Sequence, residues 1–243
     1  MKAMILAAGL GTRLKPLTNE KPKALLKAGP YTLLEFAIKK LKYSGFTDII
    51  INVHHHASQV MDYLKSNANF GCNITISDET SQLLDTGGAL RKAAAFFDDD
   101  QPFMIYNADI VGNIDLKEVY DFHSGSGNEA TLVVRRRNST RYLLFDETMQ
   151  LVEWENITKG LRKVARLTKK PPQAFAFSGI HVMNPSLLYL LGDRQVFSII
   201  DFYLEIAQNH RIGGFFDKST LFADAGKPES LIEADKIATE IVF

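Results

Sequence analysis

Short apolar runs alternate with longer segments whose apolar residues recur at helical spacing through the first half of the chain. The runs predict strands over 3–7, 48–53, 73–77 and 103–106, and the helical spacing predicts helices over 33–43, 58–66 and 88–97. Such regular alternation is typical of βαβ units. We therefore predict an α/β fold with a Rossmann-like, mainly parallel sheet flanked by helices on both faces.

The pattern changes after residue 125, where strand-like segments dominate. Strands are predicted over 130–136, 142–146, 151–155 and 175–183, followed by helices over 186–191, 198–209 and 228–239. No hexapeptide repeat occurs, so we expect no C-terminal β-helix. We predict one domain over 1–243, whose parts 1–125 and 126–243 each bear a ligand site, the second in a smaller β region.

A glycine loop carries the first candidate chemistry. It reads Leu-Ala-Ala-Gly-Leu-Gly-Thr-Arg from Leu6 to Arg13 and is followed by Lys23. The loop comes after an apolar run, so it is expected at the carboxyl end of the first strand, where α/β folds bind ligands. Leu14 stands where a dinucleotide fingerprint needs a small residue, and the Walker A spacing is absent. Two cations beside glycine N–H groups suit a triphosphate; the alternative is a tight turn with solvated charges.

Two aspartates follow short apolar runs. Asp109 ends Asn107-Ala108-Asp109, and Asp224 lies in Phe222-Ala223-Asp224-Ala225-Gly226. Magnesium prefers oxygen ligands and commonly takes only one or two carboxylates together with phosphates and water. Asp109 and Asp224 are therefore candidate Mg²⁺ ligands, and the alternative for each is a helix N-cap or a turn residue.

These motifs resemble the signature of the sugar-1-phosphate nucleotidyltransferases over nearly the whole chain. The resemblance implies an enzyme that joins a nucleoside triphosphate to a sugar-1-phosphate and releases pyrophosphate, with Mg²⁺ at Asp109 and Asp224. It implies catalytic roles for Arg13, which holds the triphosphate, and Lys23, which bridges the α-phosphate and the sugar phosphate. Residues 1–125 would mainly bind the nucleotide, and 126–243 would bind the sugar phosphate and supply the second metal ligand.

The resemblance also implies a set of nucleotide-binding residues. Thr86 and Gly87 belong to Asp85-Thr86-Gly87-Gly88, which resembles the base-recognition turn of the family, although an ordinary helix start with an N-cap threonine has the same composition. The full nucleotide-binding set is Leu6, Ala8, Gly9, Gly11, Thr12, Thr86, Gly87 and Asn107.

On the sugar side the chain departs from the family. Many members carry Glu-Lys facing the sugar phosphate, and here the pair is Glu155-Asn156. Glu155 is expected to bind sugar hydroxyls, and the missing charge would come from Arg141, Lys159 or Lys163. Ser178 and Gly179, in a strand similar to the one beneath the sugar, would line the pocket, or serve packing alone.

Two other features invite a functional role. His54, His55 and His56 are consecutive after a strand, so neighbouring side chains point to opposite faces and a three-ligand metal site is disfavoured. Their role is structural or solvated, with contacts near the nucleotide as the alternative. Trp154 is expected in the core or in a pocket wall, which leaves stacking on a sugar open.

Composition limits the classes of partner that we expect this chain to bind. The 243 residues include 28 Lys and Arg and 28 Asp and Glu, so the formal net charge is zero. No basic block exceeds Arg135-Arg136-Arg137, which argues against nucleic acid. No apolar run approaches the roughly 18 residues of a spanning helix, so no membrane insertion is expected. A single cysteine and no recognisable signal peptide favour the cytoplasm, and the oligomeric state stays open.

The choice of substrates rests on resemblance alone. The short chain, the Asp-Thr-Gly-Gly turn and the segment from Phe177 to Pro185 most resemble N-acetylmuramate-1-phosphate uridylyltransferases of cell-wall sugar recycling. Mannose-1-phosphate guanylyltransferases are nearly as similar. We expect UTP and N-acetylmuramate-1-phosphate; the alternatives are guanylyl transfer to mannose-1-phosphate, cytidylyl transfer to a phospho-alcohol, and a non-enzymatic nucleotide-sugar sensor.

Overall fold

The computed structural model describes residues 1–243 and contains a mixed ten-stranded sheet. Its strands are β1 (Lys2–Leu6), β4 (Asp48–Val53), β5 (Asn73–Asp78), β6 (Phe103–Asn107), β8 (Ala130–Arg135), β9 (Arg141–Phe145), β10 (Leu151–Asn156), β11 (Leu161–Val164), β12 (Gln173–Met183) and β13 (Ile212–Phe216). Two ribbons lie outside it and pair β2 (Lys27–Ala28) with β3 (Tyr31–Thr32) and β7 (Ile110–Gly112) with β14 (Phe222–Asp224).

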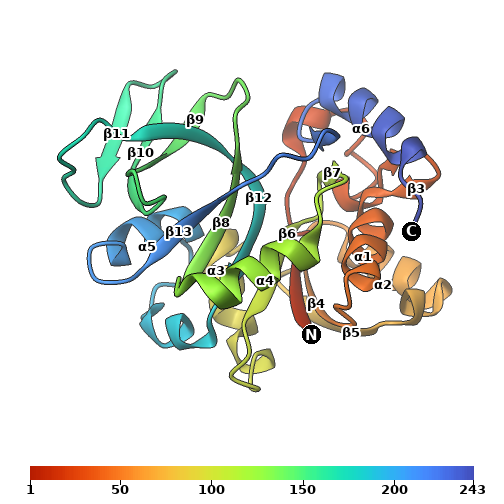
Figure 1. The fold of residues 1–243 in the computed structure, drawn as a ribbon. Helices are drawn as coiled ribbons and strands as arrows, with labels where there is room; N and C mark the ends of the chain where they lie inside the picture. Colours follow the sequence, from red (N-terminus) through yellow and green to blue (C-terminus); the bar gives the residue numbers. More distant parts are fainter.

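The sheet runs in the order β11-β10-β9-β12-β6-β1-β4-β5, and β8 joins β12 to β13. Strands β6, β1, β4 and β5 are parallel neighbours. The long strand β12 runs antiparallel to β6, β8 and β9 and therefore carries the sheet into the second half of the chain (Figure 1). The expected α/β architecture is confirmed, with an antiparallel β region added to the parallel part.

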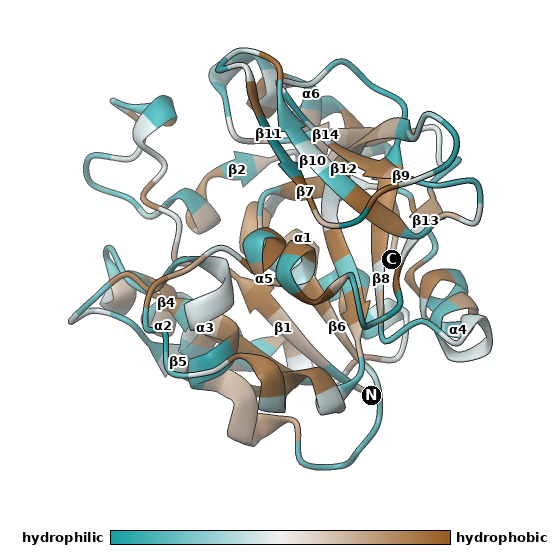
Figure 2. Ribbon diagram, turned by 90° about the vertical axis from the view of Figure 1, so that its left-hand side faces the viewer, coloured by the Kyte–Doolittle hydropathy of each residue, from teal (hydrophilic) through white to brown (hydrophobic).

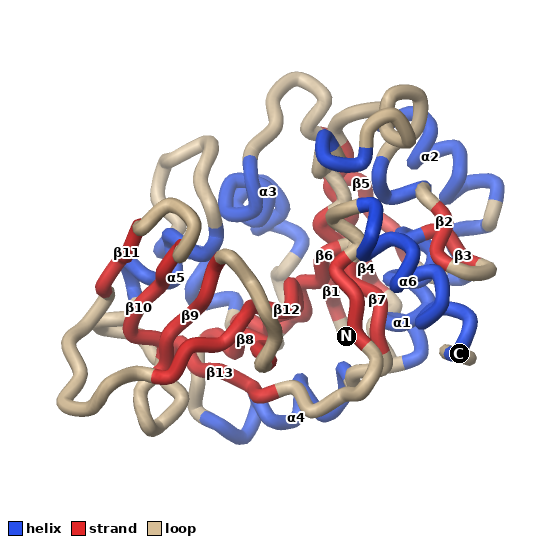
Figure 3. Tube along the Cα trace, turned by 90° about the horizontal axis from the view of Figure 1, so that it is seen from above, coloured by secondary structure: helices blue, strands red, loops and turns tan.

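Six α-helices accompany the strands: α1 (Leu33–Tyr43), α2 (Ala57–Ser66), α3 (Asp85–Ala93), α4 (Leu116–Ser126), α5 (Ile199–Ile206) and α6 (Pro228–Glu240). Single-turn 3₁₀ segments occupy Thr12–Leu14, Lys23–Leu25, Ala68–Gly71 and Ala94–Phe96, and a longer one covers Pro185–Leu190. Seen from above, α1, α2 and α6 lie on the right-hand side of the molecule, and β9, β10 and β11 lie on the left-hand side (Figure 3). No helix has the length and apolar character needed to cross a membrane.

Both faces of the sheet are buried at β1, β4 and β6, because the residues of these strands are apolar on both sides. Ala3 and Ile5 pack with α1, α2 and α4, whereas Met4 and Ile50 pack with α3 and α5. Figure 2 shows the hydrophobic colour on β1 and β6 in the interior. Strands covered on both sides read as continuous apolar runs, which explains why the sequence pattern located them well.

Helix α1 and strand β4 have the bounds expected from the sequence. Seven helices and strands were not predicted, namely α4, β2, β3, β7, β11, β13 and β14. Every residue of β11 is exposed, so it has no apolar face to detect, and β7 has only three residues. Helix α4 buries His123, a polar residue at a core position. The helix predicted over 186–191 is a 3₁₀ segment that begins at Pro185.

A third hydrophobic cluster joins the chain's two ends on the side of α6. It contains Ala234 and Ala238 of α6, Val111 of β7 and Ala223 of β14. Leu14, 1% exposed, packs into the same cluster. The predicted glycine loop is therefore anchored against the C-terminal part of the chain.

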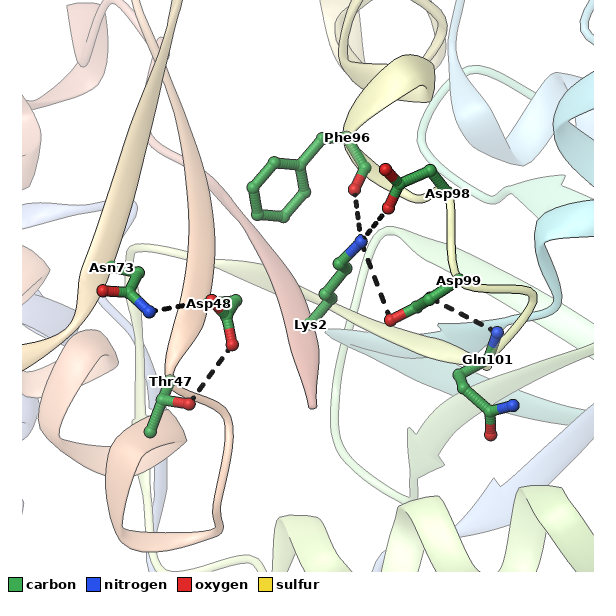
Figure 4. Close-up of polar contacts among 8 residues, drawn as sticks. All are labelled: Lys2, Thr47, Asp48, Asn73, Phe96, Asp98, Asp99 and Gln101. Carbon is green, nitrogen blue, oxygen red and sulfur yellow. Dashed lines mark hydrogen bonds and ion pairs between the residues drawn. The ribbon is translucent and has the colours of Figure 1, made fainter.

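The amino-terminal end of β1 is held by ionic contacts (Figure 4). Lys2 donates a hydrogen bond to the Phe96 carbonyl at 2.9 Å, pairs with Asp98, and lies 3.6 Å from an oxygen of Asp99. The hydrogen bond to Asp98 raises the pKa of Lys2. These contacts lie at the amino-terminal end of β1. The candidate site lies at the opposite end of this strand, where β1 ends at Leu6.

The buried imidazole of His181 makes the stability of the fold depend on pH. His181 on β12 is 1% exposed and lies 2.6 Å from the Tyr203 hydroxyl, and burial lowers the pKa of His181 to about 3. An unfolded chain protonates this imidazole near pH ~6.5. Between those values the unfolded state binds a proton that the folded state does not, so acid destabilises the fold by up to about 1.4 kcal/mol per pH unit.

His181→Gln is accordingly expected to lose melting temperature less steeply than the wild type between pH 7 and pH 4. Thermal unfolding at a series of pH values measures the two slopes. Equal slopes would show that His181 is not the group responsible.

Candidate functional site

The carboxyl ends of β1, β4 and β6 open into a first cavity of about 470 Å³. Its lining combines residues from the glycine loop, from the start of α3 and from the segment after β6. Of the residues predicted from the sequence, it includes Leu6, Ala8, Gly9, Lys23, Thr86, Asn107 and Asp109. The parallel strands bring these segments, which are distant in the sequence, together at their carboxyl ends. This is where α/β folds bind their ligands.

A buried polar network forms part of the wall of the first cavity. Asn52 accepts a hydrogen bond from the Ala7 N–H at 2.7 Å and donates one to Glu79 at 2.8 Å. The other carboxylate oxygen of Glu79 accepts from the Leu84 N–H at 3.1 Å. His54 donates to the Glu79 carbonyl at 2.7 Å, which gives this histidine a structural role. Together the contacts fix the glycine loop relative to the chain that leads into α3.

Sequence reasoning missed Asn52, although a signal was present. Asn52 is the one amide in the otherwise aliphatic run from Ile49 to Val53, and it lies near the strand's carboxyl end. A buried side-chain amide is costly unless its donors and acceptor are satisfied. A polar residue near the end of a core strand therefore indicates a built contact.

The glycine loop is held by a side chain from the segment that follows it. Thr18 donates to the Gly11 carbonyl at 2.9 Å, and Gly11 has a φ of +63°. A Cβ at Gly11 would lie 2.8 Å from a methyl of Thr18, so both conformation and space require glycine. Thr12 and Arg13 follow as a 3₁₀ turn whose side chains are exposed. Gly9 lines the first cavity, whereas Gly11 and Thr12 do not.

Lys23 and Asp109 line the first cavity, and Asp224, the second predicted metal ligand, lies beside Asp109. Lys23 forms an ion pair with Asp109. The Asp109 carbonyl accepts a hydrogen bond from the Ala225 N–H at 2.9 Å, so Asp224 is held beside Asp109. Burial and the negative charge of Asp109 raise the pKa of Asp224, while Lys23 opposes that shift.

The carboxylates of Asp109 and Asp224 suit a divalent cation, because a positive ion between them would relieve their mutual repulsion. Their carboxylates are oxygen donors of the kind Mg²⁺ prefers. No group of three or more His, Cys, Asp or Glu side chains forms a metal cluster in the chain. The pair therefore needs ligand oxygens or water to complete a coordination shell.

A second cavity, of about 980 Å³, lies between the β region and the start of α5 and is also lined by Asp224. Its cations are Arg13, Arg137, Arg141, Lys163 and Lys227. Arg13 and the Asp224 carboxylate flank Gly226, whose Cβ would lie 2.7 Å and 2.9 Å from them. Asp109 lines the first cavity and Asp224 lines the second, so the two cavities adjoin at this pair of carboxylates.

Sequence reasoning missed Arg137 as a site residue. Its guanidinium donates to the Phe177 carbonyl at 3.1 Å, stacks over Phe222 at 5.5 Å and lies 4.0 Å from Asp224. Arg135 stacks on the same Phe222 ring at 4.4 Å. Alternation along the strand gave a signal, because Arg135 and Arg137 share one side while Arg136 points away.

Of the two residues predicted for base recognition, Thr86 lines the first cavity and Gly87 does not. Gly87 is buried in α3, its N–H donates to the Phe197 carbonyl at 2.8 Å, and a Cβ there would overlap the Phe197 ring. Thr86 faces the first cavity, and its hydroxyl accepts from the Ile199 N–H at 2.9 Å. Neither is the helix N-cap, which is Leu84.

On the sugar side, Trp154 and not Glu155 lines the second cavity. Successive strand residues point to opposite faces, so Glu155 lies on the far side of β10. Ser178 is 1% exposed, and its hydroxyl has no hydrogen-bond partner. Gly179 has a φ of +73°, and a Cβ there would lie 2.9 Å from the Asn107 side chain, so this glycine lets β12 approach the end of β6.

Comparison with known proteins extends along the chain. The mannose-1-phosphate guanyltransferase of Yarrowia lipolytica is 28% identical over 238 residues, which cover 96% of this chain and 62% of that protein. The enzyme of the same name from Saccharomyces cerevisiae is 29% identical over 245 residues, covering 96% and 63%. The chain thus spans less than two thirds of the length of these relatives.

Solved structures share the fold. A proposed glucose-1-phosphate thymidylyltransferase from Bacillus anthracis, in complex with sucrose, superposes with a TM-score of 0.84 at 22% identity, covering 100% of this chain and 97% of that one. An apo UDP-glucose pyrophosphorylase superposes with a TM-score of 0.77 at 20% identity, covering 98% of each chain. The Nucleotidyl transferase family model matches residues 2–240, and the chain belongs to that family.

Proposed function

We propose that this protein joins a nucleoside triphosphate to a sugar-1-phosphate, with release of pyrophosphate. The observation that carries the proposal is the junction of the two cavities, where Lys23 pairs with Asp109 beside Asp224. The first cavity suits the nucleotide, because the glycine loop borders it, and the second suits a phosphorylated acceptor, because cations line it. Family membership and the names of the relatives support the same reaction.

In this reaction an oxygen of the acceptor phosphate attacks the α-phosphorus of the triphosphate in line. A new P–O bond forms, the bond from the α-phosphorus to the bridging oxygen breaks, and pyrophosphate leaves with that electron pair. The acceptor is already an oxyanion, so no protein nucleophile is needed. The work of the protein is to orient two anions that repel each other and to offset the charge on the transferring group.

Lys23 is suited to the transferring phosphoryl group, since its ammonium lies where the cavities meet. Arg13 lines the second cavity at the same junction and is suited to phosphate oxygens that extend toward it. A planar guanidinium binds phosphate with two parallel hydrogen bonds, whereas an ammonium acts as a compact charge. The two cations are thus fitted to different parts of the phosphate chain.

Asp109 and Asp224 would hold Mg²⁺, with ligand oxygens or water completing its coordination. The ion supplies charge neutralisation at the phosphates. This role follows from the donor set and from the repulsion between the two carboxylates described above. The residues of the chain also keep the two carboxylates in place, through the hydrogen bond from Ala225 to the Asp109 carbonyl.

The substrates proposed are UTP and N-acetylmuramate-1-phosphate, with GTP and mannose-1-phosphate as the second candidate that the relatives' names favour. The second cavity has five cations against the carboxylates of Asp201 and Asp224, which favours an anionic sugar phosphate over a cationic phospho-alcohol such as phosphocholine. Lys163 already lies 5.5 Å from the Trp154 ring, where a quaternary ammonium would otherwise stack. Retention of Lys23, Arg13 and both aspartates argues against a sensor without turnover.

Pyrophosphate release tests the proposal directly. The protein is incubated with Mg²⁺, each nucleoside triphosphate in turn, and the 1-phosphates of N-acetylmuramate, mannose, glucose and N-acetylglucosamine. Release with one pair and not with others names the substrates. Binding of a triphosphate without release for any of these acceptors would contradict transfer to these sugar phosphates and would point to an acceptor outside the panel, such as phosphocholine, or to the sensor.

A further inference from the structure

A bridge of two side chains, Asn52 and Glu79, connects two separate parts of the lining of the first cavity. One part is the glycine loop, and the other is the turn into α3, which contributes Asp85 and Thr86. Asn52 and Glu79 line the same cavity and join these segments through hydrogen bonds. A nucleotide with its phosphates at the loop and its base at the turn contacts both parts, so their separation determines how its α-phosphorus is presented.

The first contact of the bridge lies where β1 leaves the sheet. Leu6 is the last residue of β1 and pairs with Asn52 on β4, and Ala7 follows it outside the strand. The Ala7 N–H donates to the side-chain oxygen of Asn52 at 2.7 Å. Because an N–H can only donate, the amide oxygen of Asn52 faces Ala7 and its NH₂ group faces Glu79. Asn52 therefore holds the start of the glycine loop in place.

Glu79 carries the connection from Asn52 to the turn before α3. One carboxylate oxygen accepts from the Asn52 NH₂ group at 2.8 Å, and the other accepts from the Leu84 N–H at 3.1 Å. The backbone of Glu79 is held as well, because its N–H donates to the Val53 carbonyl at 2.8 Å and its carbonyl accepts from the His54 ring at 2.7 Å. The carboxylate therefore projects from a fixed backbone and links the end of β4 to the turn.

The stability of the fold does not require polar groups at these two positions. Asn52 is 3% exposed and Glu79 is 1% exposed, and Glu79 forms no ion pair. Replacing both partners of a buried hydrogen bond by apolar groups of the same shape is often neutral or stabilising. Ile50, on the same face of β4 as Asn52, packs in this way in the core. A hydrogen-bonded pair adds fixed distances and directions, which apolar packing does not provide.

We infer that Asn52 and Glu79 are positioning residues, which hold the glycine loop at the separation from the α3 turn that aligns a bound triphosphate for attack. The inference rests on the proposed function, because it requires a nucleotide that contacts both parts of the first cavity. Each side chain acts through a backbone N–H, that of Ala7 or that of Leu84, and not through the reacting atoms. A misplacement of about 1 Å can cost on the order of a hundredfold in rate, so the bridge acts mainly on kcat.

Exchange of the amide and the carboxylate tests the bridge. Asn52→Asp sets two buried carboxylates against each other, and Glu79→Gln turns one amide N–H donor toward another donor. Each single variant therefore breaks a contact of the bridge. The double variant restores all three contacts, because the carboxylate at position 52 accepts from Ala7 and from the amide at position 79, whose oxygen accepts from Leu84.

Pyrophosphate release is measured with the nucleotide and the acceptor that the wild type uses best. Asn52→Asp and Glu79→Gln are each expected to lower kcat by about tenfold to a hundredfold. KM for the acceptor should stay within about twofold of the wild type, because neither residue lines the second cavity. The double variant should recover kcat to within about threefold of the wild type, since its two changes compensate each other.

Ser77→Ala is the matched control. Ser77 lies on β5 directly opposite Asn52, is 5% exposed, and its hydroxyl has no hydrogen-bond partner. The change removes a buried polar group beside the bridge and leaves the bridge intact, so kcat should match the wild type. Thermal unfolding of each variant separates loss of kcat from loss of folded protein. Glu79→Gln keeps the size of the side chain and carries the test if Asn52→Asp does not fold.

Wild-type kcat in Glu79→Gln would overturn the inference and leave the reaction intact. A double variant no more active than the single variants would also overturn it, since the two side chains would then act separately. Losses of kcat that only follow the melting temperature would assign the bridge to stability. A wild type that releases no pyrophosphate with any pair would overturn the proposed transfer and this inference together.

Discussion

Lys23→Ala is expected to lower kcat for pyrophosphate release by about a thousandfold, as removal of a comparable cation does in other phosphoryl transfers. The ammonium pairs with Asp109 where the two cavities meet, and its side chain is 14% exposed. Its charge is needed most when negative charge spreads over the transferring group, so kcat should fall more than affinity for either substrate. Steady-state kinetics with each substrate varied in turn measures both effects.

Lys21→Ala provides the matched control, because Lys21 is an exposed lysine two residues earlier in the same loop. It should keep wild-type kcat. Thermal unfolding of both variants checks that the loop remains folded. Turnover of Lys23→Ala near the wild-type rate would remove this lysine from the mechanism.

Asp224→Asn is expected to reduce turnover by about a hundredfold to a thousandfold and to make the metal-free protein more stable. The first effect follows from loss of one of two carboxylates proposed to hold Mg²⁺ at the phosphates. The gain in stability follows from the direction of the pKa shift. Burial and the charge of Asp109 raise the pKa of Asp224, so the ionised form of Asp224 is disfavoured in the folded state. An uncharged amide of the same shape removes that penalty above the ordinary carboxyl pKa.

Two measurements distinguish these effects. Pyrophosphate release is titrated with Mg²⁺, and the melting temperature is recorded with and without the ion. The wild type should gain melting temperature on addition of Mg²⁺ and nucleoside triphosphate, and Asp224→Asn should start higher and gain less. Asp62→Asn, which changes an exposed aspartate on α2, is the control and should match the wild type. A variant that starts lower and still responds fully to Mg²⁺ would contradict the proposed metal site.

Features that are contiguous along the chain can be predicted from the amino-acid sequence. The strand before the glycine loop, the loop itself, and the acids Asp109 and Asp224 are all marked by short apolar runs that form strands. Once a parallel sheet is inferred, the ends of its strands must meet at one edge. The close approach of Lys23 and Asp109, 86 residues apart, was therefore within reach of sequence reasoning.

Contacts across strands were out of reach, because register is set by packing and turns over the whole sheet. The pairing of Arg141 with Asn156 depends on the turn after β9, and the direction of Glu155 depends on which face of β10 packs inward. The network from Ala7 through Asn52 to Glu79 joins three segments whose spacing carries no local signal.

Local periodicity and chain order were enough to establish the α/β class, the position of the glycine loop and the identity of the charged residues at the strand ends. Which of those charges are satisfied within the protein, and which face a cavity, was settled by the packing of the folded chain. Those outcomes depend on distances of a few ångströms between segments far apart in the sequence. Electrostatic interactions change steeply over such distances, so Arg137 interacts with Asp224 at 4.0 Å while Arg141, on the same stretch of chain, forms no ion pair.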